Sequence, residues 1–209
     1  MLQWAVVIGH HKKLYLIIKN MIIDDKRKII FCHVEKTAGS SITTSFWPEY
    51  KRDSEFEPVN YEGKHASMVS SSKYNNYFKF AFVRNPYDRA LSKYFHHRRI
   101  KGAFPPFERA AKELSFNDWV SQGGLSLFRP QTQLLYKEKN LLCNFVGRFE
   151  TLHEDIQKVS KICNINATLL HLNKGLPRES FINYYNDNSL DYVWSKYKDD
   201  FINFNYEKI

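Results

Sequence analysis

Three short apolar runs, each followed by the start of a helix, constrain the fold of this chain more than any other feature. Each run has the length of a buried strand and is too short for a typical helix. The runs occupy residues 28–34, 77–83 and 141–146. A strand that leads into a helix, repeated along the chain, is typical of α/β proteins, whose strands lie parallel in one sheet. We therefore predict an α/β fold with a short, mainly parallel sheet.

The predicted helices begin with recognisable capping signals. After the second run, Asn85 can cap the helix, Pro86 can be its first residue, and Asp88 places an acid in the first turn. After the third run, Thr151 and Glu154 have the spacing of a capping box. The last helix is predicted to begin near residue 188, and further helices and loops to occupy residues 104–124 and 129–139.

Length and composition favour one domain over residues 1–209. A chain with 43% hydrophobic and 16% aromatic side chains can bury one substantial core. The apolar runs within the first 18 residues are too short for the roughly 20 residues of a membrane-spanning helix. We expect residues 1–27 to form a helical segment packed on the domain, with weak contact to a membrane surface as the alternative. Residues 48–76 are the least regular stretch, where we expect substrate-binding loops.

Charge and cysteine content bear on the partners and the cellular compartment of the protein. The net charge of +9 attracts anionic partners without identifying them. Cys32, Cys143 and Cys163 lie far apart, and no pair has metal-ligand spacing. A reduced, cytoplasmic protein is the simpler interpretation.

The turn after the first predicted strand contains one lysine, one glycine and several hydroxyl groups. Backbone N–H groups at a helix start, with Gly39 allowing close approach, can hold a phosphate-like anion. Lys36 adds a positive charge, and Ser40 and Ser41 add donors. The alternative is an ordinary capped strand–turn–helix junction. A nucleotide-hydrolysing phosphate loop fits poorly, because here the lysine precedes the glycine.

A second polar pair follows the second predicted strand. Arg84 leaves the strand end, and Ser92 lies two turns into the next helix. An arginine fork and a nearby hydroxyl can bind a phosphate together. The alternative is that Arg84 pairs with Asp88 and Ser92 is merely exposed.

Taken together, the two segments resemble the carbohydrate-type sulfotransferases, the family that includes heparan sulfate 2-O-sulfotransferase and many bacterial relatives. Members carry a strand ending in His-Val-Pro-Lys-Thr-Ala/Gly-Gly-Thr/Ser-Ser and a later strand ending in Phe-Val-Arg-Asn-Pro-Tyr-Asp-Arg. Residues 31–42 and 82–92 follow both patterns, except that Glu35 stands where most members have proline. Weaker similarity continues through residues 146–155 and 200–206.

The resemblance implies a P-loop-like three-layer fold and 3′-phosphoadenosine 5′-phosphosulfate as the sulfate donor. Its 5′-phosphosulfate would be held by six consecutive residues, Lys36, Thr37, Ala38, Gly39, Ser40 and Ser41. Arg84 and Ser92 match the pair that holds the 3′-phosphate, and Arg178 matches a late loop over the nucleotide. Lys36 would also stabilise charge on the bridging oxygen as the bond to sulfur breaks. No metal is implied.

The acceptor implied is a hydroxyl of a carbohydrate or glycolipid. The attacking hydroxyl must lose a proton, and His65, 19 positions before Arg84, matches the region where relatives place their catalytic histidines. We expect substrate contacts from His96 and His97, at the end of the Arg84 helix, and from Arg98 and Arg99, which come directly after them. The alternatives are an inactive relative that binds donor and glycan, or a magnesium-dependent kinase. No nucleic-acid-binding motif is present.

Overall fold

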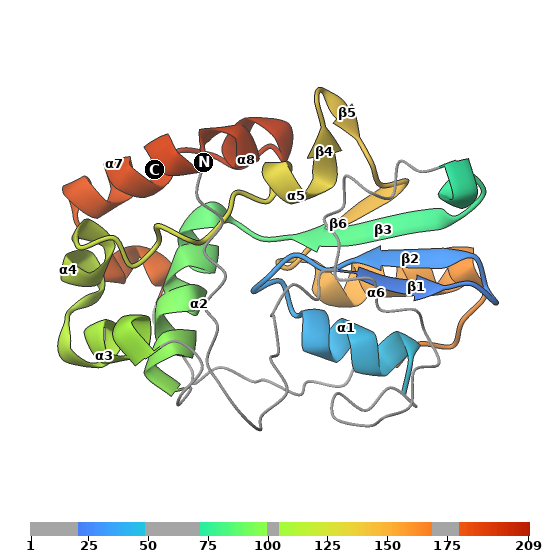
Figure 1. Ribbon diagram of the computed structural model, residues 1–209, viewed down its shortest axis with the longest axis horizontal. Helices are drawn as coiled ribbons and strands as arrows, with labels where there is room; N and C mark the ends of the chain where they lie inside the picture. Colours follow the sequence, from blue (N-terminus) through green and yellow to red (C-terminus); the bar gives the residue numbers. More distant parts are fainter. Residues whose placement is uncertain (1–20, 49–71, 100–104, 169–179) are drawn as a thin grey trace, which may run out of the picture.

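A four-stranded sheet lies at the centre of the protein (Figure 1). The computed structural model describes residues 21–48, 72–99, 105–168 and 180–209. The sheet order is β1 (Met21–Asp24), β2 (Ile29–Cys32), β3 (Phe78–Val83) and β6 (Phe145–Arg148). β2, β3 and β6 run parallel, and only β1 is antiparallel to its neighbour. The predicted α/β class and mainly parallel sheet are confirmed.

The start of the described chain corrects one prediction. Residues 21–24 were expected to belong to a helical segment, but they form β1, which pairs with β2 in a hairpin. The hairpin is favoured because Asp24 closes its turn, accepting hydrogen bonds from the backbone and side-chain nitrogens of Arg27 at 2.9 and 3.0 Å. The apolar residues of β1 are also fully buried. Residues 1–20 of the predicted segment lie outside the described residues.

The third strand begins later than the sequence indicated. Leu141 belongs to a separate small hairpin, formed by β4 (Tyr136–Lys137) and β5 (Asn140–Leu141). Asn144 then joins the sheet edge, because its backbone N–H donates to Lys79 at 2.7 Å and its side chain accepts from Lys79 N–H at 2.8 Å. The parallel strand β6 therefore covers Phe145–Arg148 rather than residues 141–146.

The helices divide between two apolar cores. α1 (Gly39–Phe46) and α6 (Leu152–Cys163) follow strands β2 and β6 and pack on the sheet. The remaining helices are α2 (Pro86–Arg99), α3 (Pro105–Glu113), α4 (Phe116–Ser121), α5 (Thr132–Leu135), α7 (Asp187–Lys196) and α8 (Lys198–Asn203), with short 3-10 turns at Ser72–Tyr74 and Phe181–Tyr184. Figure 1 shows α2, α3, α4 and α7 gathered beyond the carboxyl end of β3. A second core of buried aromatic residues joins these helices, and Tyr206 packs against both cores.

The capping predictions had different outcomes. Asn85 accepts a hydrogen bond from the N–H of Tyr87 at 2.9 Å, so the predicted start of α2 is confirmed. The predicted capping box at Thr151 is wrong, because its hydroxyl donates to the Asp155 carboxylate at 2.8 Å instead of accepting from the backbone. α7 does begin near the predicted position, but the chain turns at Tyr197 and continues as α8. Within the described ranges, no helix is long and apolar enough to cross a bilayer.

Candidate functional site

The turn between β2 and α1 has an unusual backbone. Lys36 and Ala38 have φ values of 72° and 65°, in the left-handed region that non-glycine residues seldom adopt. Such positions cost roughly 1–3 kcal/mol each and persist only when neighbours hold them. Thr37 contributes to this hold, since its fully buried hydroxyl donates to the Val34 carbonyl at 2.8 Å. The hydroxyl predicted to bind the donor is therefore used inside the turn.

Gly39 is required by packing at the first residue of α1. A Cβ atom added there would overlap the imidazole ring of His33. That ring stacks on Phe31, with centroids 5.7 Å apart, so His33 is part of the packing. Ser40 and Ser41 form the first turn of α1, with Ser40 exposed and Ser41 only 7% exposed.

Arg84 connects the two segments predicted to bind the donor. Its Nη1 donates to the backbone carbonyl of Lys36 at 3.2 Å, across the boundary between β2 and β3. Its Nε and Nη2 bind the Asp88 carboxylate at 2.8 and 2.6 Å, so the alternative pairing considered from the sequence is present. The guanidinium also lies 3.8 Å above the ring of Phe149. Ser92 is partly buried, two turns further along α2.

Glu35, which replaces the proline of the family pattern, forms an ion pair with Lys93 of α2. Burial alone would raise the pKa of the Glu35 carboxyl, but the nearby cations of Lys93, Arg89 and Lys36 outweigh it and lower that pKa. The carboxylate beside the turn is therefore neutralised by a base on the neighbouring helix.

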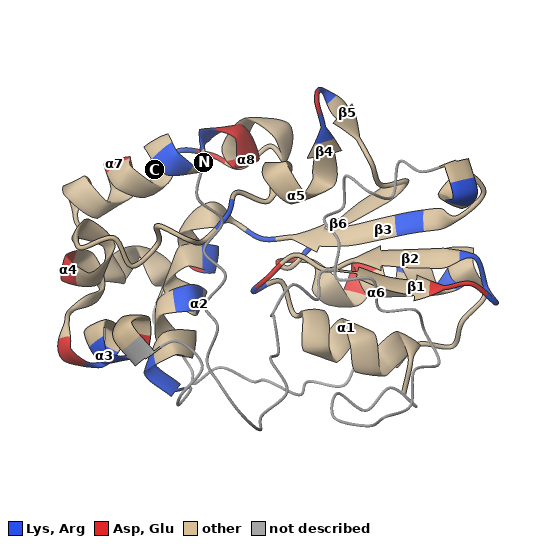
Figure 2. Cartoon of the chain, in the orientation of Figure 1, with Lys and Arg blue, Asp and Glu red and all other residues tan. Residues whose placement is uncertain are grey.

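The ammonium group of Lys36 lies in a positively charged environment. Burial lowers its pKa to about 8; Glu35 opposes the change, while Lys93, Arg99 and Arg84 add to it. Among the residues that the structure describes, no carboxylate lies within ion-pair distance of this ammonium. Figure 2 shows basic residues at the end of β2 and along α2. The arrangement is suited to binding a multiply charged anion.

The four residues predicted to bind substrate separate into two groups. Burial and the cations of Lys36 and Lys93 lower the pKa of His96 to about 4, and Arg99 acts electrostatically on Lys36. His96 and Arg99 therefore belong to the same positive field as Lys36.

His97 and Arg98 differ from these two because they pack against α3, although burial and the cations of Lys93 and Lys36 also lower the pKa of His97 to about 4. His97 is 3% exposed and stacks on Phe107 of α3, with centroids 5.8 Å apart. Arg98 donates to the hydroxyl of Tyr94 and to the carbonyl of Ala111 at 2.8 and 3.1 Å. Both side chains contact α3 and hold it against α2.

A buried polar network connects the turn and the end of β3 to α8. Arg89, 1% exposed, donates to the Glu35 carbonyl at 3.0 Å and lies 3.9 Å from the Asp200 carboxylate. Asp200 accepts from the N–H groups of Gln131 and Thr132 at 2.8 and 2.7 Å. Gln131 in turn exchanges two hydrogen bonds with the backbone of Arg84, at 2.9 and 2.8 Å. Both segments predicted to bind the donor are thus attached to the carboxyl-terminal helices.

Sequence reasoning did not assign Arg89, Gln131 or Asp200 to the site. Arg89 and Asp200 lie within the motifs that carry the family resemblance, and this was the available signal. Gln131 offered none, because its partners are distant in the sequence.

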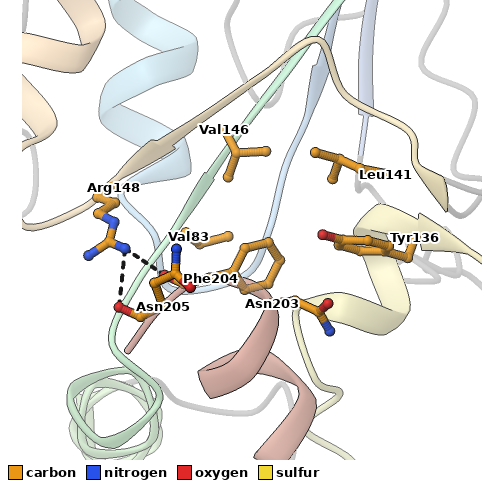
Figure 3. A pocket seen from close by; sticks show the side chains of 8 residues that line it. All are labelled: Val83, Tyr136, Leu141, Val146, Arg148, Asn203, Phe204 and Asn205. Carbon is orange, nitrogen blue, oxygen red and sulfur yellow. Dashed lines mark hydrogen bonds between the residues drawn. The ribbon is translucent and has the colours of Figure 1, made fainter. Parts of the chain in front are cut away.

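A small cavity of about 210 Å³ lies where β3, β6 and the end of α8 meet (Figure 3). Its wall combines Val83, Val146, Tyr136, Leu141 and Phe204 with the polar residues Arg148, Asn203 and Asn205. Arg148 lies at its edge and donates to the backbone carbonyls of Phe204 and Asn205 at 2.6 and 3.3 Å (Figure 3). None of the residues predicted to bind the donor lines this cavity.

Two predicted residues, His65 and Arg178, lie outside the described residues. Within the described ranges, no group of three histidine, cysteine or carboxylate side chains is placed to hold a metal ion.

The fold and the site together define an α/β protein with a positively charged turn at the carboxyl end of a parallel strand. Comparison with known families places it more closely: a model of the sulfotransferase family matches residues 19–207, and the chain belongs to this family. The resemblance inferred from the motifs is thereby confirmed.

Individual relatives agree with this assignment. Carbohydrate sulfotransferase 11 of Rattus norvegicus is 24% identical over 198 residues, covering 73% of this chain and 55% of the relative. Human carbohydrate sulfotransferase 9 is 26% identical over 191 residues, covering 73% and 43%. An uncharacterised protein of Archaeoglobus fulgidus is 30% identical over 97 residues, covering 46% and 74%. The chain thus spans about half the length of the two named sulfotransferases. No solved structure matches significantly.

Proposed function

We propose that this protein transfers a sulfuryl group from 3′-phosphoadenosine 5′-phosphosulfate to a hydroxyl of a carbohydrate. The observation that carries the proposal is the contact between Arg84 and the Lys36 carbonyl, which brings the two predicted phosphate-binding segments to one place. The carbohydrate sulfotransferases that the chain resembles support a carbohydrate acceptor.

Each segment has a distinct part in the proposed reaction. The amide groups at the start of α1, with Ser40 and Ser41, bind the 5′-phosphosulfate. Arg84 and Ser92 bind the 3′-phosphate, and Arg178 closes over the nucleotide. Lys36 neutralises the negative charge that develops on the bridging oxygen as the bond to sulfur breaks. His65 takes the proton of the attacking hydroxyl, which displaces the phosphate in line.

Substrate contacts are proposed for His96 and Arg99, which share the positive field of Lys36. The three cysteines do not form disulfides with one another, which is compatible with the reducing cytoplasm that we propose as the location.

A thermal-shift measurement tests the donor assignment. Adenosine 3′,5′-bisphosphate should raise the melting temperature without magnesium, because a ligand that binds only the folded state stabilises it. Stabilisation by ATP that requires magnesium, without any by the bisphosphate, would instead indicate a kinase. A mass-spectrometric screen of carbohydrate acceptors with the sulfate donor then distinguishes an active enzyme from a relative that only binds.

A further inference from the structure

Residue 35 is attached to α2 at two points. Its backbone carbonyl accepts from Arg89, and its carboxylate pairs with Lys93. The Arg89 guanidinium and the Lys93 ammonium both lie over the ring of Phe128, at 4.0 and 5.1 Å from its centroid. The Lys93 side chain is only 13% exposed, whereas that of Glu35 is 45% exposed. An ion pair with one partner packed in this way has a defined geometry, unlike most surface pairs.

These attachments bear directly on Lys36. Its backbone is in the left-handed region, a conformation that persists only when neighbouring groups hold it. Arg84 holds the carbonyl of Lys36, while Arg89 and Lys93 hold Glu35. The path of the chain into the turn is thus determined by α2 and by Arg84, which lies just before α2.

Charge gives the pair a second effect on Lys36. The charged groups that act on its ammonium are Glu35 beside it, Arg84 at the end of β3, and Lys93 and Arg99 on α2. His96 and His97 of α2 interact with the same charges. Glu35 is the one carboxylate in this set. The pair therefore adds one negative and one positive charge, whose effects on the pKa of Lys36 are opposite, with that of Glu35 the larger.

We infer that Glu35 and Lys93 form a positioning pair for Lys36, which directs the turn by a side-chain contact and balances the charge around the lysine. The inference rests on the proposed function, in which Lys36 meets the leaving phosphate. Neither residue of the pair is assigned a contact with the reacting atoms.

The pair predicts opposite responses to two neutralising substitutions. Glu35→Gln removes the negative charge and leaves the Lys93 ammonium unpaired, so the pKa of Lys36 falls below its value of about 8. Lys93→Met removes a positive charge while keeping the packed stem, so the pKa of Lys36 rises. If the pair only stabilised the fold, both substitutions would loosen the turn and move this pKa the same way.

Competitive acylation measures this titration without donor or acceptor. The protein is treated with acetic anhydride over a series of neutral and alkaline pH values, and acetylation of Lys36 is quantified by peptide mass spectrometry, with exposed Lys161 of α6 as internal reference. We expect the midpoint for Lys36 to move down in Glu35→Gln and up in Lys93→Met, each by at least about half a pH unit. Shifts in one direction, or none, overturn the inference.

Matched controls come from α6. Glu154→Gln neutralises an exposed acid, and Lys158→Met neutralises an exposed lysine that forms an ion pair with Asp155. Both variants should leave the Lys36 midpoint unchanged. If a single variant of the pair does not fold, the double variant Glu35→Gln/Lys93→Met decides, because it leaves no unpaired charge. Its midpoint should lie below the parent's, since Glu35 has the larger effect of the two; an unchanged or raised midpoint overturns the inference. Because no nucleotide is used, this result is separate from the thermal-shift test of the donor.

Discussion

Arg84 binds one oxygen of Asp88 through two nitrogens, with Nε at 2.8 Å and Nη2 at 2.6 Å from Oδ2. Because this contact fixes the plane of the guanidinium, Nη1 reaches the carbonyl of Lys36. Asp88 therefore orients the arginine before any phosphate is bound. Such preorganisation reduces the entropy that binding must overcome.

The first prediction concerns nucleotide binding. Arg84→Ala should weaken the binding of adenosine 3′,5′-bisphosphate by about 10- to 150-fold, since losing hydrogen bonds to a charged group costs roughly 1.5–3 kcal/mol. Isothermal titration calorimetry measures the change. Arg109→Ala, at an exposed arginine of α3, is the matched control. Equal affinity of Arg84→Ala and the parent would show that Arg84 makes only contacts within the protein and does not bind the nucleotide.

The second prediction concerns turnover. Lys36→Ala should reduce the transfer rate by about 10²-fold or more, the cost of losing one transition-state donor. It retains a Cβ atom at the left-handed position, so the melting temperature without ligand should barely move. Lys161→Ala is the control. A variant that melts early but keeps its turnover per folded molecule would assign Lys36 to stability instead.

The same lysine predicts the alkaline side of the pH profile. Lys36 must be protonated to neutralise the leaving phosphate, and its pKa is lowered to about 8. Because the charged form is lost above that value, the transfer rate should fall as the pH rises through about 8. A rate that stays constant well into the alkaline range would contradict this assignment.

The fourth prediction tests the proposed base. His65→Ala should remove most transfer and leave the affinity for adenosine 3′,5′-bisphosphate close to the parent's, because the base faces the acceptor. In the parent, the rate should fall on the acid side with an apparent pKa near the ordinary value of about 6.5. His153→Ala, at an exposed histidine of α6, is the control.

Near-parental transfer by His65→Ala would show that another residue is the general base, and Glu35, Glu62 and His96 are the next candidates. Both described candidates are weakened as bases, since nearby cations lower the pKa of Glu35, and burial with nearby cations lowers that of His96 to about 4.

The fifth prediction concerns the network beneath the site. Asp200→Ala should reduce the free energy of unfolding by about 3–5 kcal/mol, because it leaves the Arg89 charge buried without its carboxylate. Denaturant titration measures the loss. Asp199→Ala, at the exposed neighbouring position in α8, should cost less than about 1 kcal/mol. Similar losses from both would mean that only the helix start is affected.

Local patterns in the sequence predicted local structure well. The strand that ends before Lys36, the strand that ends at Arg84 and the Asn85 cap all depend on neighbouring residues. The failures involve distant partners: β1 forms because β2 folds back on it, and Thr151 turns to Asp155. The site was predicted from its motifs alone, whereas the contact between Arg89 and the Glu35 carbonyl could not be foreseen from any spacing rule.

The link from Glu35 through Arg89 to Asp200 has a consequence for the order of events during synthesis. On the ribosome, the turn at Lys36 emerges early, whereas the carboxylate that faces Arg89 is among the last parts of this sequence to be made. The contact between Arg89 and Asp200 can therefore support the turn only after α8 has been synthesised. Until α8 docks, the network that connects Glu35 and Arg84 to Asp200 is incomplete, and the two segments proposed to bind the donor lack this common support.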